Sequence, residues 1–207
     1  MEIICTSIGF CLFSYLLGSI PFGYMVAKSK GIDIRSIGSG NIGATNVGRA
    51  LGKKWQFIVL ILDALKGIVA VLLAEQLFKS QDHLSSFAPL LAGICVIAGH
   101  NWTIFLKFKG GKGVSTTAGV ILALSPIAFL AGLGTYLVTT KITKYVSLGS
   151  MLGSVAISIA IFLLPQDKKH PIYLQIFGIL ISGLVVFRHK ENIKRLLKGE
   201  EAKIVKS

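Results

Sequence analysis

Apolar residues are concentrated in long runs, near positions 3–27, 57–78, 84–106, 146–164 and 171–187. An α-helix rises 1.5 Å per residue, so about 20 apolar residues cross the roughly 30 Å hydrocarbon core of a membrane. The pattern therefore predicts five transmembrane helices. The first run is too long for the core of a signal peptide, so we expect it to be a retained span.

A sixth apolar stretch, residues 114–138, is interrupted by Ser125-Pro126 and by three glycines. Its 25 residues would reach only about 37 Å as a helix, which is too short for two full crossings. Proline ends or kinks a helix, because it lacks a backbone N–H and clashes with the preceding turn. The stretch therefore crosses once, or it forms shortened helices that break at Ser125-Pro126 and return.

The basic residues decide between these arrangements, because Lys and Arg collect in the cytoplasmic loops of membrane proteins. With 28–56 inside and a single crossing by 114–138, 11 basic residues lie inside and ten outside. With two shortened helices, 18 lie inside and three outside. We therefore expect an external N-terminus, a cytoplasmic C-terminus, and segments 107–113, 139–147 and 188–199 on the cytoplasmic side with 28–56.

The composition supports an all-α, polytopic membrane protein. Hydrophobic residues make up 53% of the 207 residues and the mean hydropathy is +0.72, both above the level of soluble domains. We expect one membrane-embedded domain over residues 1–207. The net charge of +13 does not indicate nucleic-acid binding, because nucleic-acid-binding chains are not built around long apolar runs. Membrane topology or an anionic substrate accounts for it better.

The cysteines and two of the histidines carry no chemical signal. Cys5, Cys11 and Cys95 lack the spacing of metal ligands and lie in apolar segments, so we expect ordinary buried thiols. His83 and His170 fall in the predicted outer loops and are expected to have no chemical role.

A glycine-rich stretch, "GSGNIGATNVGR" at 38–49, follows the first span. It contains G-x-G-x-x-G, but a dinucleotide site needs a strand before the motif and a βαβ unit around it, which this pattern excludes. Glycines allow left-handed backbone and let amides turn toward an anion. Ser39, Asn41, Thr45 and Asn46 add neutral hydrogen-bonding groups, and Arg49 adds a fork for phosphate. The stretch is a candidate phosphate site.

A second stretch, "GGKGVST" at 110–116, repeats this chemistry with one lysine and hydroxyls that open a helix. It is not a Walker A loop, because Leu106 and Gly113 occupy positions where that motif needs Gly and Ser or Thr. Either stretch alone could be a flexible cytoplasmic loop. Two such loops together favour an anion site.

Several polar residues are expected to be structural. Asp63 and Lys66 are three positions apart on one helical face, so they are expected to pair inside a span. His100 and Asn101, near the end of the third span, could orient a loop or touch substrate. The basic tail 188–199 is typical of an interfacial helix that binds anionic lipid.

Five segments together resemble a known family: "SIPFGYMVAKSKGIDIRSIGSG", "GSGNIGATNVGR", "DALKG", "AGHNWTIFLKFKGGKGVST" and "RHKENIKRLLKGEE". In order and content they resemble the bacterial acyl-phosphate:glycerol-3-phosphate acyltransferases of the PlsY type, from Ser19 to Glu201. The resemblance implies an inner-membrane enzyme of about seven transmembrane helices. Its reaction moves a fatty acyl group from acyl-phosphate to the 1-hydroxyl of sn-glycerol 3-phosphate, giving lysophosphatidic acid and phosphate.

The resemblance also implies site residues, with His189, Asn192 and Lys112 in catalysis and the others binding phosphate. They are Ser39, Asn41, Thr45, Asn46 and Arg49; Lys109, Gly111 and Lys112; Ser147 or Ser150; and His189 with Asn192. The general base is either His189 or a phosphate oxygen of a substrate. No metal or cofactor is expected. The partners implied are the two substrates, membrane lipid and the enzyme that supplies acyl-phosphate.

Two other classes of protein have a similar composition. An anion transporter would need polar groups through the membrane midplane, whereas only Asp63 and Lys66 are ionisable inside a predicted span. A CDP-alcohol phosphotransferase would need an aspartate-rich metal motif, and the sequence has none. The His-x₄-Asp pair of acyl-CoA acyltransferases is also absent from the sequence.

Overall fold

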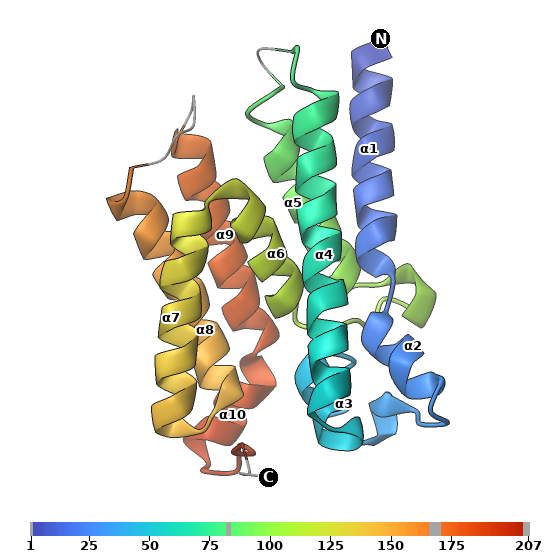
Figure 1. Cartoon of the computed structure of the whole chain (residues 1–207), viewed down its shortest axis with the longest axis vertical. Coiled ribbons are helices and arrows are strands. Elements are labelled where there is room, and N and C mark those ends of the chain that lie inside the picture. Colours follow the sequence, from blue (N-terminus) through green and yellow to red (C-terminus); the bar gives the residue numbers. More distant parts are fainter. Residues whose placement is uncertain (1, 82–83, 166–170, 205–207) are drawn as a thin grey trace. The chain divides into compact units, whose positions relative to one another are not determined.

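The computed structural model describes residues 2–81, 84–165 and 171–204, and every regular element in them is a helix (Figure 1). His83 and His170 lie outside the described residues. The α-helices are α1 (Glu2–Ser19), α2 (Phe22–Lys28), α3 (Ala44–Leu51), α4 (Lys53–Leu77), α5 (Ala88–Asn101), α6 (Val114–Leu124), α7 (Pro126–Thr143), α8 (Val146–Leu163), α9 (Pro171–Arg188) and α10 (Lys190–Leu197), with 3₁₀ turns η1 (Ile34–Ser36) and η2 (Ile104–Leu106).

The five predicted spans are confirmed as helical segments that are long and apolar enough to cross a membrane. They are Ile4–Lys28, Lys53–Leu77, Ala88–Leu106, Val146–Leu163 and Pro171–Arg188. The sixth stretch breaks at Ser125-Pro126, as expected, between α6 and α7. The expectation that both helices of this stretch are shortened is wrong for α7: it continues to Thr143, and its 18 residues rise about 27 Å, whereas α6 has 11 residues.

The first predicted span is broken at Pro21 into α1 and α2. Proline cannot donate the next helical hydrogen bond, and the break frees backbone carbonyls inside the membrane. Lys66 Nζ donates to the Ile20 carbonyl at 3.2 Å, and the Thr103 hydroxyl donates to the Ser19 carbonyl. The break is therefore stabilised by side chains from α4 and from the segment after α5.

The helices group into two compact units, residues 1–124 and 125–207. The first unit packs α1 along α5, and α4 along α3, α5 and α6. Glycines allow the closest approaches, which is typical of membrane helices. A Cβ at Gly18 would lie 2.0 Å from the Val96 carbonyl oxygen, and one at Gly119 would lie 2.0 Å from the Ala64 carbonyl oxygen.

The second unit packs α8 between α7 and α9, with α10 following α9. Serines join α8 to α9: the Ser158 hydroxyl donates to the Gly178 carbonyl at 2.7 Å, and the Ser182 hydroxyl donates to the Ser154 carbonyl at 2.5 Å. After α10 the tail returns to the loop between α7 and α8, where the Ile204 N–H donates to the Lys144 carbonyl at 2.9 Å. A single domain over residues 1–207 remains our prediction.

The expectation of buried thiols is wrong for Cys5. This residue is exposed on α1, whereas Cys11 and Cys95 are half-buried. The reason is that α1 packs on its neighbours over only part of its surface, and apolar side chains such as Ile4 and Ile8 are each 64% exposed. Exposure of apolar groups is expected on a helix that faces lipid.

Candidate active site

The first glycine-rich loop has the backbone conformation that its sequence predicts. Gly38 and Gly40 have φ values of 57° and 67°, in the left-handed region that favours glycine. A Cβ at Gly38 would lie 2.4 Å from Asn46 Oδ1, so a larger residue would also displace that side chain. The loop leads directly into α3, whose first residue, Ala44, follows Gly43.

Asn46 organises this loop from inside. Its side chain is buried, and Nδ2 donates to the carbonyls of Ile37 and Asn41, both at 2.9 Å, and more weakly to that of Ile34 at 3.2 Å. Its Oδ1 accepts the Ser39 N–H at 3.1 Å. Because both ends of the amide are used within the loop, Asn46 contributes to the site by shaping it.

The other polar residues of the stretch are more accessible. Ser39 and Arg49 are exposed, and Thr45 is half-buried in the first turn of α3. Asn41 is half-buried, and its Oδ1 accepts the Gly43 N–H at 2.9 Å, which turns the chain into the helix. The amides of the first turn of α3 and the Arg49 guanidinium therefore belong to one short segment that suits an anion.

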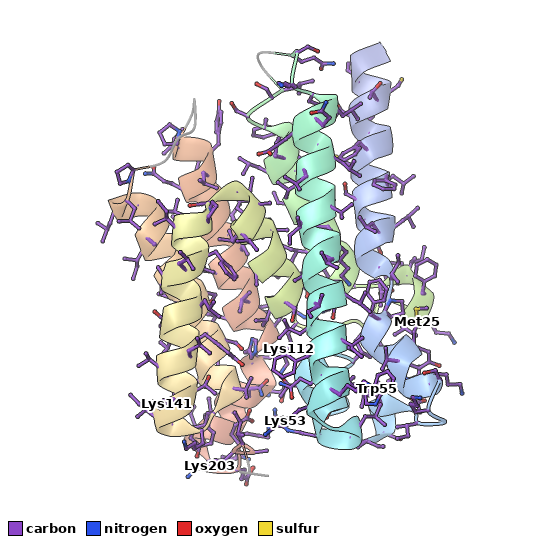
Figure 2. The ribbon with its side chains drawn as sticks, viewed as in Figure 1. Met25, Lys53, Trp55, Lys112, Lys141 and Lys203 are labelled. Atoms are coloured by element: carbon purple, nitrogen blue, oxygen red, sulfur yellow. The ribbon has the colours of Figure 1, made fainter. Side chains whose placement is uncertain are left out.

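The second glycine loop is folded against the end of α5. The Gly111 N–H donates to the His100 carbonyl at 3.0 Å. A Cβ at Gly110 would lie 2.1 Å from that carbonyl oxygen, and one at Gly113 would lie 2.8 Å from Asn101 Oδ1. His100 and Asn101 thus contact the loop directly, and both roles expected for them, orienting the loop or touching substrate, stay predictions. Of the loop's lysines, Lys109 is exposed and Lys112, labelled in Figure 2, is half-buried.

The two glycine loops of the first unit are attached to one hydrophobic core. Leu106, just before the second loop, packs on a cluster that surrounds the first loop. The buried residues of this cluster come from α2, η1, the first loop, α3 and α4: Ala27, Ile34, Ile42, Ala44, Val47 and Val59. A shared core restricts the movement of one loop against the other.

In the second unit, three polar side chains converge on Glu201. The Ser147 hydroxyl and Asn192 Nδ2 both donate to Glu201 Oε1 at 2.7 Å, and Arg195 Nε donates to Oε2 at 2.8 Å. Burial of Glu201 raises the pKa of its carboxyl group, but these hydrogen bonds and the charge of Arg195 outweigh burial and hold the pKa below its usual value. The carboxylate therefore stays charged and fixes Ser147 and Asn192 beside each other.

Sequence reasoning did not find Glu201. The residue lies at the end of a basic tail that was interpreted as a lipid anchor, and the only signal was a lone acidic pair after "KG". Arg195 in that tail forms a salt bridge with Glu201 at 2.8 Å, so it is part of this cluster. Of the two candidate serines, Ser147 belongs to the cluster, whereas the Ser150 hydroxyl donates to the Val146 carbonyl of its own helix at 2.9 Å.

His189 is buried at the junction of α9 and α10. Its Nδ1 is 2.8 Å from the Val185 carbonyl oxygen, which can only accept, so Nδ1 carries a proton. In the neutral ring Nε2 is then the basic nitrogen. This tautomer is the one that a general base at Nε2 would need.

The predicted site residues thus form two groups. Eight belong to the first unit: Ser39, Asn41, Thr45, Asn46, Arg49, Lys109, Gly111 and Lys112. Four belong to the second: Ser147, Ser150, His189 and Asn192. The first group has the features of a phosphate-binding site, and the second has a hydrogen-bonded carboxylate, an amide, a hydroxyl and an imidazole.

Helical membrane architecture, glycine loops suited to phosphate and a polar cluster of this kind are features of an integral membrane enzyme that acts on phosphorylated substrates. Known proteins make the assignment specific. Residues 8–199 match the family named glycerol-3-phosphate acyltransferase. A glycerol-3-phosphate acyltransferase of Desulforamulus reducens is 50% identical over 200 residues, 96% of each chain. One from Aquifex aeolicus is 42% identical over 194 residues, 92% of this chain and 95% of that one.

A solved structure agrees with these relatives. The crystal structure of PlsY (YgiH), an integral membrane glycerol 3-phosphate acyltransferase, in its glycerol 3-phosphate form, is 40% identical and has a TM-score of 0.88 to this chain. The match covers 97% of this chain and 96% of the other. The chain therefore belongs to the glycerol-3-phosphate acyltransferase family, and it is an integral membrane enzyme of that class.

Proposed function

We propose that the enzyme transfers a fatty acyl group from acyl-phosphate to the 1-hydroxyl of sn-glycerol 3-phosphate, giving lysophosphatidic acid and inorganic phosphate, the first step of phospholipid synthesis. The assignment of acyl-phosphate as the donor rests on two separate glycine loops, 38–43 and 110–113, each followed or flanked by basic side chains. Acyl-phosphate and glycerol 3-phosphate each bring one phosphate. The related PlsY has been crystallised in glycerol 3-phosphate and lysophosphatidic acid forms, which agrees with this acceptor and product.

The chemistry suits these residues. The 1-hydroxyl oxygen attacks the acyl carbon, a new ester C–O bond forms, and the C–O bond to phosphate breaks as phosphate leaves with the electron pair. The hydroxyl proton passes to a base. A mixed anhydride already has a good leaving group, so the enzyme needs to align the substrates and neutralise phosphate charge rather than supply a covalent nucleophile.

The roles follow from this chemistry and from the geometry of each unit. Arg49, Lys109 and Lys112, with the hydroxyls of Ser39 and Thr45, neutralise and orient phosphate. Gly111, whose N–H donates to the His100 carbonyl, shapes the second loop around it. Asn41 and Asn46 shape the first loop through their hydrogen bonds to its backbone.

In the second unit we assign substrate contact to Ser147 rather than Ser150, because Ser147 is held beside Asn192 by Glu201. The base is either His189 Nε2 or a phosphate oxygen of one substrate. Both are compatible with the tautomer that the Val185 carbonyl imposes on the ring.

We place the enzyme in the bacterial inner membrane with this site facing the cytoplasm. The basic segments 28–56, 107–113, 139–147 and 188–199 support that orientation through the positive-inside rule. Membrane lipid receives the product, and the enzyme that produces acyl-phosphate is the expected further partner. Acyl-phosphate carries a fatty chain, so we expect that enzyme to deliver it close to the membrane surface.

The donor is tested with the purified full-length protein in detergent or vesicles. Glycerol 3-phosphate is supplied with acyl-phosphate or with acyl-CoA of the same chain length, and lysophosphatidic acid and phosphate are measured. We expect turnover with acyl-phosphate and at most a trace with acyl-CoA, because the sequence lacks the His-x₄-Asp pair. Equal rates with both donors, or turnover with acyl-CoA alone, would contradict the proposal.

A further inference from the structure

Three ionisable side chains form a buried cluster within the first unit. Asp63, Lys66 and His100 are each no more than 6% exposed. Lys66 Nζ lies 2.8 Å from Asp63 Oδ1 and 3.0 Å from His100 Nδ1. His100 Nδ1 is in turn 3.4 Å from Asp63 Oδ1. The cluster joins α4 to the end of α5.

Such a cluster is a costly way to hold two helices together. Removing charges from water carries a large desolvation penalty, and apolar side chains of similar size usually stabilise a buried contact at least as well. Ionisable residues within membrane spans are accordingly rare, and they are found mostly at functional positions.

The ion pair holds the His100 ring from its Nδ1 side. Lys66 Nζ and Asp63 Oδ1 both lie near this nitrogen, at 3.0 and 3.4 Å. Because the two groups also pair with each other at 2.8 Å, the orientation of the imidazole is set by two side chains of α4.

The Nε2 side of the ring lies against the second glycine loop. A Cβ placed on Gly111 would lie 2.1 Å from His100 Nε2, closer than atoms approach in real structures. The neighbouring Gly110 has a different obstacle, the backbone carbonyl oxygen of His100, also 2.1 Å from an ideal Cβ. The path of the loop at Gly111 thus depends on the imidazole, and at Gly110 it depends on the backbone.

We propose that Asp63, Lys66 and His100 are positioning residues for acyl transfer: the ion pair holds the His100 ring, and the ring holds the loop 110–113 in its phosphate-binding conformation. The inference rests on the proposed function in one respect, that this loop binds a substrate phosphate. None of the three residues needs to touch a reacting atom. They act through Gly111 and, beyond it, Lys112.

The difference between Gly110 and Gly111 provides the test. The full-length enzyme is prepared in detergent as Gly111→Ala, His100→Ala and the double variant, and kcat and KM are measured for both substrates. Gly111→Ala should lower kcat/KM by about tenfold to a hundredfold, because a displaced loop misaligns phosphate. In the double variant the ring is absent, so activity should rise from the Gly111→Ala level to that of His100→Ala.

Gly110→Ala is the matched control. The Cβ added at Gly110 would meet the backbone carbonyl oxygen of His100, which remains when the imidazole is removed. His100→Ala should therefore not restore the activity of Gly110→Ala. Rescue of Gly111→Ala but not of Gly110→Ala supports the proposal. Additive losses at Gly111, or equal rescue at both glycines, overturn it. Should His100→Ala fail to fold, His100→Asn shortens the side chain with a polar group retained and takes its place in the cycle.

A second measurement separates positioning from a purely structural role. Asp63→Asn combined with Lys66→Met removes both charges together, so neither is left buried alone. We expect a folded protein whose unfolding temperature falls because the Lys66 bond to the Ile20 carbonyl is lost. Its KM for one phosphate-bearing substrate should also rise about tenfold, which a purely structural role would not produce. Wild-type kinetics in this variant would overturn the proposal. The measurements can use any acyl donor that the wild type accepts, so failure of the acyl-phosphate assignment leaves this test intact.

Discussion

Arg49 and Asn46 are one helical turn apart in α3 but have different surroundings. Asn46 is 2% exposed and its amide is bonded within the first glycine loop, whereas Arg49 is exposed. The exposed guanidinium is in a position to meet a phosphate, and the buried amide keeps the loop that would receive it in shape. In the proposed phosphate site, the loop thus separates an exposed candidate binding residue from a buried supporting one.

Replacement of Arg49 tests whether the first loop is an anion site. Arg49→Gln should lower kcat/KM by about ten- to a hundredfold, because a charge-assisted hydrogen bond to phosphate is lost. Arg49→Lys should lie between this variant and the wild type, since it keeps the charge but loses the planar fork. The measurement is steady-state kinetics on protein whose unfolding temperature is unchanged.

The control for this series lies at the start of α4. Lys53 (labelled in Figure 2) and Lys54 are exposed, and Lys53→Gln with Lys54→Gln should leave kcat/KM within about twofold, as expected for exposed charge that only sets topology. Near-normal kinetics for both Arg49 variants would mean that the loop is only a connector.

At the level of elements, Glu201 joins three parts of the second unit that are separate in sequence. Ser147 lies in the first turn of α8, Asn192 and Arg195 lie in α10, and Glu201 lies in the tail. A single carboxylate accepts hydrogen bonds from all of them. α10 is only eight residues long, too short to be stable by itself in water, so these tertiary contacts position it.

Glu201→Gln should therefore loosen α10 and lower the unfolding temperature at neutral pH, by about 5 °C if one charged hydrogen-bond network is lost. The folded state holds the pKa of Glu201 below its ordinary value of 4.5. The contribution of the Glu201 carboxylate to the free energy of unfolding is thus complete above that pH. It is lost as the pH falls through the pKa of the folded state. Thermal unfolding of both proteins should show the difference narrowing below about pH 4.5.

Glu191→Gln provides the comparison for this change. Glu191 lies on the same helix, but its 3.3 Å pair with Lys194 is exposed, and such pairs contribute little. Its unfolding temperature should follow that of the wild type at every pH. A constant difference between Glu201→Gln and wild type down to the lowest pH would contradict the charged state assigned to Glu201.

At the scale of the molecule, basic side chains gather at one end of each unit. In the first unit Lys53 and Trp55 lie where α4 begins, at the opposite end from the N-terminus (Figure 2). In the second unit Lys141 lies in the last turn of α7, and Lys203 follows α10. Lys30 and Lys203 lie over Trp55 and Tyr145, with Nζ 4.7 and 5.4 Å from the ring centroids. Cation–aromatic pairs are common where helices leave the hydrocarbon.

Cysteine labelling tests the membrane orientation. In a variant without Cys5, Cys11 and Cys95, single cysteines at Lys53 and Lys203 should be protected from an impermeant thiol reagent in intact cells and react after permeabilisation. A cysteine at Ser80, in the predicted outer loop, should react in intact cells. Reaction at position 203 in intact cells would restore the alternative in which residues 114–138 cross once.

The helical spans, the break at Ser125-Pro126 and the left-handed glycines of the first loop could be predicted from the sequence alone. Each depends on a local property: the length of an apolar run, the missing N–H of proline, or the absence of a Cβ. The break at Pro21 has the same cause, the missing N–H of proline, but the apolar run 3–27 around it predicts only a single span.

The contacts that support the candidate site could not be predicted without the packed structure. Ser147 and Glu201 are separated by 54 residues, and Lys66 and His100 by 34, so no local pattern relates them. The sequence shows that residue 46 is an asparagine but not that its amide is hydrogen-bonded inside the loop. It also gives no reason to prefer Ser147 over Ser150. These distinctions arise from burial and hydrogen bonding between distant segments, which are fixed when the helices pack.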